Sequence, residues 1–283
     1  MQRAVKWVLG IFTGVFIGML YLPFISMFIL SFQDPLGGST FPMKGFSLYF
    51  YQRLFNLTDL RVKYAEEGTL NIGFYAPLLR SLALAVVTLS ITVVLATLAA
   101  QGFRKPFKGS GVVFYTFLLG IITPGVSVGL GLALFFQQLG VDRSWLGTTL
   151  VVHVLWTLPF AFLIMLIMFN RFDETVEEAA RVLGANEWTT FRTVTLPLMR
   201  PGIMSAALFS FTLSFDELAR TMFLTGPKQT LPLTTLQALT LRITPKLYAW
   251  GSIITLISLA ILGVYLIYIA RSLRRQRKGP APG

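Results

Sequence analysis

Long uninterrupted apolar segments constrain the fold of this 283-residue chain more than any other feature of its sequence. A helix needs about 20 apolar residues to cross the hydrocarbon core of a bilayer. Segments of that length lie at residues 7–32, 77–102, 111–136, 146–169, 202–223 and 247–270. Lipid cannot hydrogen-bond the open edges of a sheet, and these runs do not alternate as the strands of a membrane barrel do. The sequence therefore predicts an all-α integral membrane protein with six transmembrane helices in a single domain, residues 1–283.

The first apolar segment has a second interpretation, because Arg3 and Lys6 precede it as basic residues precede the core of a secretory signal. Its apolar run is longer than a signal core, and no Ala-x-Ala cleavage site follows. We therefore expect a retained span.

The composition excludes several kinds of chemistry. Only 13% of the residues are charged, whereas soluble proteins carry about 25%. There is no cysteine, and His153 is the single histidine, so we expect no metal site and no catalytic residues. The chain also lacks a Gly-x-x-x-x-Gly-Lys-Ser/Thr run. We expect no directly bound cofactor.

The formal net charge of +12 is distributed at the ends of the apolar runs, which favours anionic membrane lipid over nucleic acid as the partner. Basic residues gather around positions 104–108 and 271–278, whereas the short loop after the third run has only Arg143. The positive-inside rule then places both termini in the cytoplasm. The outer segment 33–76 includes an irregular stretch, 58–68, and its role stays open.

The loop at residues 170–201 predicts two short helices between the fourth and fifth spans. Four acidic residues, from Asp173 to Glu178, suit the positive end of a helix dipole, and Asp173 is the expected N-cap. Gly184 is expected to end that helix in the left-handed conformation. A second helix follows over 187–194, and Leu196-Pro197 is expected to stop it.

This loop resembles the signature loop of permease subunits of bacterial ATP-binding-cassette importers. The matching residues are Glu178-Ala179-Ala180, Gly184, Val194 and Leu196-Pro197, and Val194 in place of Ile is the one departure. The resemblance implies a type I importer permease fold whose coupling helices sit in a cleft of the ATPase, with Arg181 at the contact. The alternative is an ordinary amphipathic surface helix.

Further segments resemble the polyamine branch of these permeases, and within it the second permease subunit. They are Ser214-Phe215-Asp216-Glu217, Phe223-Leu224-Thr225-Gly226-Pro227 and Leu231-Pro232-Leu233. The resemblance implies two ATP-binding subunits that use ATP and Mg, a second homologous permease in a heterodimer, and an extracytoplasmic solute-binding protein. It also implies a location in the bacterial inner membrane. It favours a polyamine-like solute, although the branch also serves opines, phosphonates and other anionic or zwitterionic solutes.

Candidate residues of the translocation path are Asp216, Glu217, Pro124 and Gly125. Acidic residues in a span are costly, so the two carboxylates either attract a cationic solute or pair with Arg220. Pro124-Gly125 would kink the third span and expose backbone polar groups. Polyamine permeases often carry an acidic residue after that proline, and Gly125 departs from this pattern. A secondary transporter is the main rival class, and an integral membrane enzyme is the other.

Overall fold

The computed structural model describes residues 2–55, 73–241 and 245–277, and the predicted irregular stretch 58–68 lies outside them. The described residues are mostly helical, with one isolated antiparallel bridge between Gln33 and Phe46, which confirms the all-α prediction. The chain divides into two compact units, residues 1–75 with 234–260 and residues 76–233 with 261–283. The single domain over 1–283 stays a prediction.

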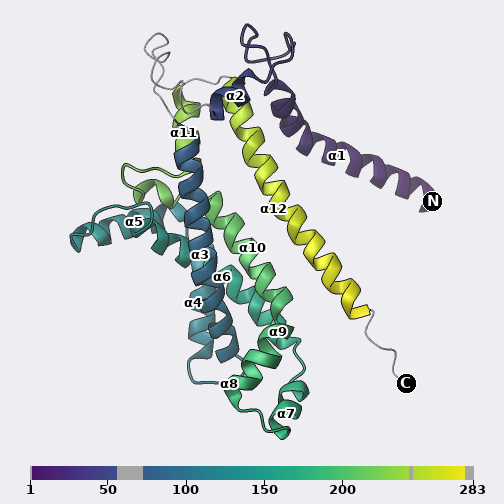
Figure 1. The fold of residues 1–283 in the computed structure, drawn as a ribbon, viewed down its shortest axis with the longest axis vertical. Coiled ribbons are helices and arrows are strands. Elements are labelled where there is room, and N and C mark those ends of the chain that lie inside the picture. Colours follow the sequence, from purple (N-terminus) through teal and green to yellow (C-terminus); the bar gives the residue numbers. More distant parts are fainter. Residues whose placement is uncertain (1, 56–72, 242–244, 278–283) are drawn as a thin grey trace. The chain divides into compact units, whose positions relative to one another are not determined.

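The helices are numbered in chain order, as labelled in Figure 1. They are α1 (Gln2–Leu30), α2 (Tyr49–Phe55), α3 (Tyr75–Gly102), α4 (Ser110–Ile122), α5 (Gly125–Gln138), α6 (Thr148–Asn170), α7 (Thr175–Val182), α8 (Glu187–Thr190), a π-helical turn (Phe191–Thr195), α9 (Leu196–Leu198), α10 (Arg200–Phe215), a 3-10 turn (Thr221–Phe223), α11 (Leu231–Leu241) and α12 (Pro245–Arg277). Among the described residues, α1, α3, α6 and α12 are each long and apolar enough to cross a membrane. Two bent helix pairs raise the number of candidate spans to six.

The third predicted span, 111–136, consists of two helices in the structure, because α4 and α5 meet at an angle of 105°. Thr123 is extended, with φ −65° and ψ 128°, because the proline that follows it disfavours the helical conformation. Pro124 itself has no N–H to continue the helical hydrogen-bond ladder. The Pro124-Gly125 signal was therefore read correctly as a bend, but its size was underestimated.

The fifth predicted span, 202–223, also needs correction at its end, because α10 stops at Phe215. The apolar residues after it form the separate 3-10 turn Thr221–Phe223. Leu196-Pro197 does not stop the preceding helix as predicted, since a proline is tolerated in the first turn of a helix, here α9. The bend of 67° falls at Met199, just before α10 begins.

The second unit is built around α6, which packs against α3, α4 and α10 (Figure 1). Small residues of α3 and α10, such as Ala96 and Ala206, face large residues of α6, such as Phe162 and Met165, and all four are fully buried. At Gly202 a Cβ atom would lie 2.5 Å from Cγ of Met168. Close approach at small residues is how membrane helices gain packing contacts.

Buried polar side chains join the helices of this unit. His153 of α6 hydrogen-bonds through Nδ1 to the Ser214 hydroxyl at 2.7 Å and through Nε2 to the Thr221 hydroxyl at 2.8 Å. The hydroxyls of Thr92 and Thr157 join α3 to α6 at 2.8 Å. Each of these groups would be costly in lipid without a partner. His153 is thus a structural hydrogen-bonding residue.

The first unit contains a compact turn after α1. The buried side chain of Gln33 donates to the Gly38 carbonyl at 3.1 Å and accepts the backbone N–H of Lys44 at 3.0 Å. The rings of Phe32 and Phe46 stack above this turn with centroids 4.9 Å apart. One glutamine therefore fixes the path of an otherwise irregular segment.

A matched pair of glycines in α5 gives a test of packing. A Cβ atom at Gly129 would lie 2.7 Å from the carbonyl oxygen of Arg220, whereas Gly131 has nothing within 4 Å. We expect Gly129→Ala to cost about 1–3 kcal/mol through overpacking. Gly131→Ala should be neutral or gain up to about 1 kcal/mol, because Ala is the better helix former. Thermal unfolding of the purified protein in detergent checks this, and equal melting temperatures for both variants would contradict the packing.

Candidate functional site

The α7–α9 segment, residues 173–198, lies at the end of the second unit where α6 finishes and α10 begins (Figure 1). The prediction that Asp173 is the N-cap of α7 is wrong, because α7 begins at Thr175 and Glu174 occupies the cap position. The Asp173 carboxylate instead accepts the Thr175 hydroxyl at 2.7 Å and the Thr175 backbone N–H at 3.0 Å. These hydrogen bonds lower the pKa of Asp173.

Gly184 connects the two short helices in the way its position predicted. Its φ of +90° lies in the left-handed region, and its N–H donates to the Arg181 carbonyl at 2.9 Å. Asn186 then caps α8, its side-chain oxygen accepting the Thr189 N–H at 2.8 Å. The cap was missed, although Asn is among the best N-cap residues.

Exposed apolar side chains lie on both sides of this turn. Val182, Leu183 and Trp188 have 87%, 88% and 67% of their surface exposed, and we call these three residues the docking face. The predicted contact residues Glu178, Ala179, Arg181 and Gly184 are also exposed, Ala180 is half-buried, and Leu196 and Pro197 are partly buried. A cluster of large apolar side chains beside polar ones is typical of a protein–protein contact.

One buried ion pair holds α7 against the rest of the unit. Arg104, in the turn after α3, donates to both carboxylate oxygens of Glu177, at 2.9 Å and 2.8 Å. The two side chains are 10% and 9% exposed. The Thr195 hydroxyl also donates to Glu177, and the Arg104 guanidinium lies 5.2 Å from the Phe172 ring centroid. The pair connects three parts of the chain: the end of α3, α7 and the π-helical turn.

The charge states of this pair follow from its contacts. Burial acts to raise the pKa of Glu177, but the hydrogen bonds from Arg104 and Thr195 outweigh it, and the net shift is downward. The hydrogen bond to Glu177 raises the pKa of Arg104 against the opposing effect of burial. Both groups are therefore ionised throughout the neutral range. The sequence did not reveal this pair, because 73 residues separate its members.

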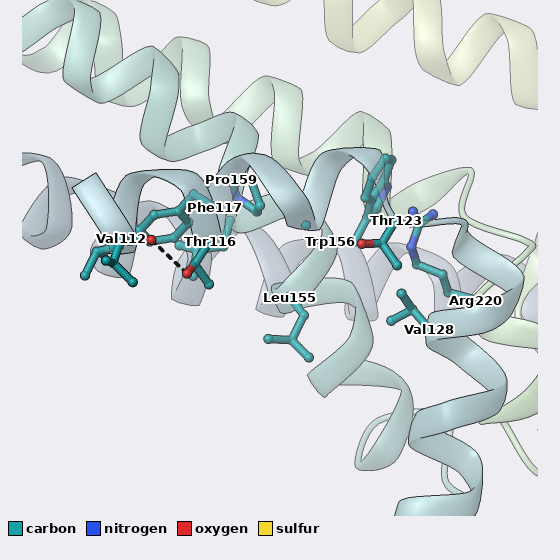
Figure 2. Close-up of a pocket in the computed structure, with 12 residues that line it drawn as sticks. Val112, Thr116, Phe117, Thr123, Val128, Leu155, Trp156, Pro159 and Arg220 are labelled. Atoms are coloured by element: carbon teal, nitrogen blue, oxygen red, sulfur yellow. Dashed lines mark hydrogen bonds between the residues drawn. The ribbon is translucent and has the colours of Figure 1, made fainter. Parts of the chain in front are cut away.

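A cavity of about 360 Å³ lies beside the bend between α4 and α5 (Figure 2). Its lining residues come from α4, α5 and α6, with Arg220 from the turn after α10: Val112, Val113, Thr116, Phe117, Gly120, Thr123, Val128, Leu155, Trp156, Leu158, Pro159 and Arg220. Figure 2 shows Thr123, Trp156 and Arg220 gathered at one end and Val112, Thr116 and Phe117 at the other. The cavity thus has a polar end and a mainly apolar end.

Arg220 is held in place by three contacts. Its Nη1 donates to Glu217 Oε2 at 3.0 Å, and its backbone N–H donates to Glu217 Oε1 at 2.9 Å. Its guanidinium carbon lies 3.5 Å from the ring centroid of Trp156. A Cβ atom at Gly125 would lie 2.7 Å from Nη1, so only glycine at this position leaves room for the guanidinium.

The four predicted path residues occupy different environments, and none of them lines the cavity. Glu217 is buried and paired with Arg220, which is the second of the two alternatives that the sequence left open. Asp216 is exposed, and both carboxylates lie beyond the end of α10 rather than within a helix. Pro124 and Gly125 form the bend itself. The sequence did not single out Arg220 and Trp156 as cavity residues.

Metal-binding clusters are lacking in the described part of the chain, where no group of three or more His, Cys, Asp or Glu side chains could hold an ion. The polar groups of the cavity are instead one guanidinium, one indole and two hydroxyls.

Comparison with known proteins assigns this architecture to a class. Residues 92–278 match the family described as "Binding-protein-dependent transport system inner membrane component", which covers more than half of the chain. In solved structures, the chain is similar to a bacterial ABC transporter involved in the import of the acidic polysaccharide alginate, with a TM-score of 0.62 and 19% identity over 95% of this chain and 96% of that one. At that identity the likeness shows the fold alone.

Curated relatives extend the match over most of the chain. The Spermidine/putrescine transport system permease protein PotC of Haemophilus influenzae is 30% identical over 86% of this chain and 89% of its own length. The Putrescine transport system permease protein PotI of Escherichia coli is 30% identical over 70% of this chain and 73% of its own length. The signature loop and the other segments read as permease-like lie within the matched family region. The chain therefore belongs to the family of inner membrane components of binding-protein-dependent transport systems, the permease subunits of ATP-binding-cassette importers.

Proposed function

We propose that this chain takes up a small polar solute by alternating access, driven by ATP hydrolysis that reaches it through the α7–α9 segment. The observation that carries this proposal is the docking face, an exposed apolar surface on two short helices that a buried ion pair attaches to the unit. A helix that is firmly seated transmits the movement of a bound partner to the spans, whereas a loosely attached one does not.

The family determines which subunit transports the solute and which hydrolyses ATP. As the membrane component of such a system, the chain is a transport subunit and not an enzyme, and the ATPase is a separate subunit. A solute-binding protein and a paired permease also belong to systems of this class. We propose two ATP-binding subunits that use ATP and Mg, and a second, homologous permease in a heterodimer. We also propose that both termini lie in the cytoplasm, on the same side as the docking face.

Two solute classes are favoured by different observations. A polyamine-like solute is supported by the names of the relatives, which are permeases for spermidine and putrescine. An anionic or zwitterionic solute, such as an opine or a phosphonate, is supported by Arg220, the charged side chain on the cavity wall. Stimulation of the ATPase activity of the reconstituted complex by a panel of both classes distinguishes them.

The docking face gives a direct test of the coupling role. Leu183→Glu places a charge in the centre of this face, and we expect it to weaken association with the partner ATPase by about tenfold or more, since burying an unpaired charge in an interface is costly. Leu36→Glu is the matched control, because Leu36 is 94% exposed but lies outside the α7–α9 segment. Co-purification of the ATPase with each variant, followed by uptake in proteoliposomes, provides the measurement. Normal association of Leu183→Glu would show that the ATPase binds elsewhere.

The uptake assay in proteoliposomes also tests the rival hypothesis that the chain is a secondary transporter. A secondary transporter would carry out uptake in proteoliposomes that lack the ATPase, with an ion gradient as the energy source. We expect no uptake under those conditions. Uptake without the ATPase would contradict the proposed function, whichever solute is used.

A further inference from the structure

Among the described residues that line the cavity beside the α4–α5 bend, one is charged, and it is a cation. Apolar side chains such as Val112, Phe117 and Leu155 form most of the lining, and Arg220 stands at one end (Figure 2). The two threonines of the lining donate their hydroxyls to backbone carbonyls within α4. A volume of about 360 Å³ is within the range of pockets that hold small organic molecules.

The guanidinium of Arg220 is fixed in position but keeps donors available. Within the described residues, Nη1 is the guanidinium nitrogen that donates, to Glu217, whereas a guanidinium has five N–H groups in a rigid fork. The face of the Trp156 ring supports it from one side. The indole N–H of Trp156 is itself buried and reaches no acceptor in the described part of the chain. This end of the cavity therefore offers guanidinium donors that no described residue uses.

A solute cation is not suited to this arrangement. An ammonium group would use a carboxylate and an aromatic face, which here are Glu217 and Trp156. Arg220 already occupies both, at 3.0 Å and 3.5 Å. Its guanidinium also lies against Gly125, the first residue of α5, where the helix dipole is positive. A carboxylate or phosphonate, in contrast, matches the fork of an arginine with two parallel hydrogen bonds.

We propose that this cavity is a solute subsite in which Arg220 binds the oxyanion of a small organic acid, whose apolar body lies along α4 and α6. Arg220 thereby sets the charge selectivity of the chain, since it fills the site that a cation would use and presents a cation to the solute. This inference rests on the proposed import function, because it assigns a solute class to that transport path.

Binding can be measured without ATP hydrolysis. The complete complex, in nanodiscs of phosphatidylcholine, is titrated with phenylacetate and with spermidine while tryptophan fluorescence is followed. The variant Trp156→Phe identifies the part of the signal that comes from the cavity. We expect phenylacetate to bind, and Arg220→Gln to weaken that binding about tenfold to a hundredfold, the range for loss of charged hydrogen bonds. Arg143→Gln removes an exposed arginine outside the cavity and should change nothing.

A second variant controls for folding, because Arg220→Gln leaves the buried carboxylate of Glu217 without its partner. The double variant Glu217→Gln/Arg220→Gln removes both charges and should lose phenylacetate binding to the same extent. Retained affinity in the double variant, or wild-type binding of spermidine in preference to phenylacetate, would overturn the proposal. So would a loss of phenylacetate affinity when phosphatidylglycerol is added to the nanodisc, since the oxyanion would then be a lipid headgroup. Failure of the import function would appear separately, as absence of ATPase association and of solute-stimulated hydrolysis.

Discussion

Replacing Glu177 with Gln is expected to separate ATP hydrolysis from solute uptake. The substitution removes the charge that two nitrogens of Arg104 contact at 2.9 Å and 2.8 Å in a buried position. Breaking a buried ion pair by removing one partner typically costs about 3–5 kcal/mol, because the remaining charge is left unpaired. Gln retains the shape and one acceptor, and Arg104 keeps its exposed contact with Glu174, so we expect about 3 kcal/mol, the lower end of that range. Helix α7 would then be poorly seated, and partner movement would no longer reach the spans.

The measurement is the ratio of solute taken up to ATP hydrolysed in proteoliposomes, together with amide hydrogen exchange of α7. Glu174→Gln is the matched control, since Glu174 contacts the same Arg104 at 3.2 Å but is 63% exposed. Exposed ion pairs contribute about 0–1 kcal/mol, so this variant should behave almost as wild type. Equal behaviour of the two variants would contradict the proposed role of the buried pair. Arg104→Gln, combined with Glu177→Gln in a double-mutant cycle, gives the coupling energy of the pair directly.

Replacing Gly184 with Val is expected to abolish transport while the protein remains in the membrane. The φ of +90° at Gly184 is one that residues with a Cβ rarely adopt, and β-branched residues least of all. The left-handed conformation costs an ordinary residue roughly 1–2 kcal/mol, and more for Val. A Cβ atom at this position would meet nothing within 4 Å, so the effect comes from the backbone alone. The turn between α7 and α8 would change, and Leu183 and Trp188 would no longer form one surface.

Gly184→Asn tests whether the effect of Gly184→Val comes from backbone strain or from the presence of any side chain at this position. Asn tolerates the left-handed region better than other residues with a side chain, so its variant should keep most of the association with the ATPase. Co-purification of the ATPase and uptake assays rank the two variants. Normal transport by Gly184→Val would show that the geometry of this turn does not matter for coupling.

The apolar runs and the signature loop predicted the class of this protein, but local signals carried less information about where helices end. Apolar residues continue from α10 into the 3-10 turn Thr221–Phe223, so hydropathy alone placed one span where there are two pieces. Likewise, α4 and α5 are both apolar, and the sequence shows that Pro124 bends the chain but not by how much. Periodicity and composition do not encode the direction of a bend.

Pairings between distant residues were the other information that the sequence could not supply. Arg104 could be read only as a basic residue at a membrane boundary, and Glu177 only as part of an acidic helix start. The Arg220–Glu217 pair was recognised as an alternative because its members are three residues apart. Trp156 belongs to the same cluster but is separated from it by more than 60 positions. The pairing of residues close in sequence could therefore be predicted, whereas the cavity beside that pair could be located only from the folded structure.

His153 has a mechanical consequence for the segment that carries Glu217 and Arg220. Its two ring nitrogens hydrogen-bond Ser214 before this segment and Thr221 after it, so one imidazole closes a loop at both ends. Closing a loop removes conformational freedom from everything between its ends. The segment can then rotate with α6 as one body, but it cannot open on its own without breaking a hydrogen bond to the ring. A movement of α6 would therefore carry the Arg220 guanidinium with it, so that the wall of the cavity and its charged group move together.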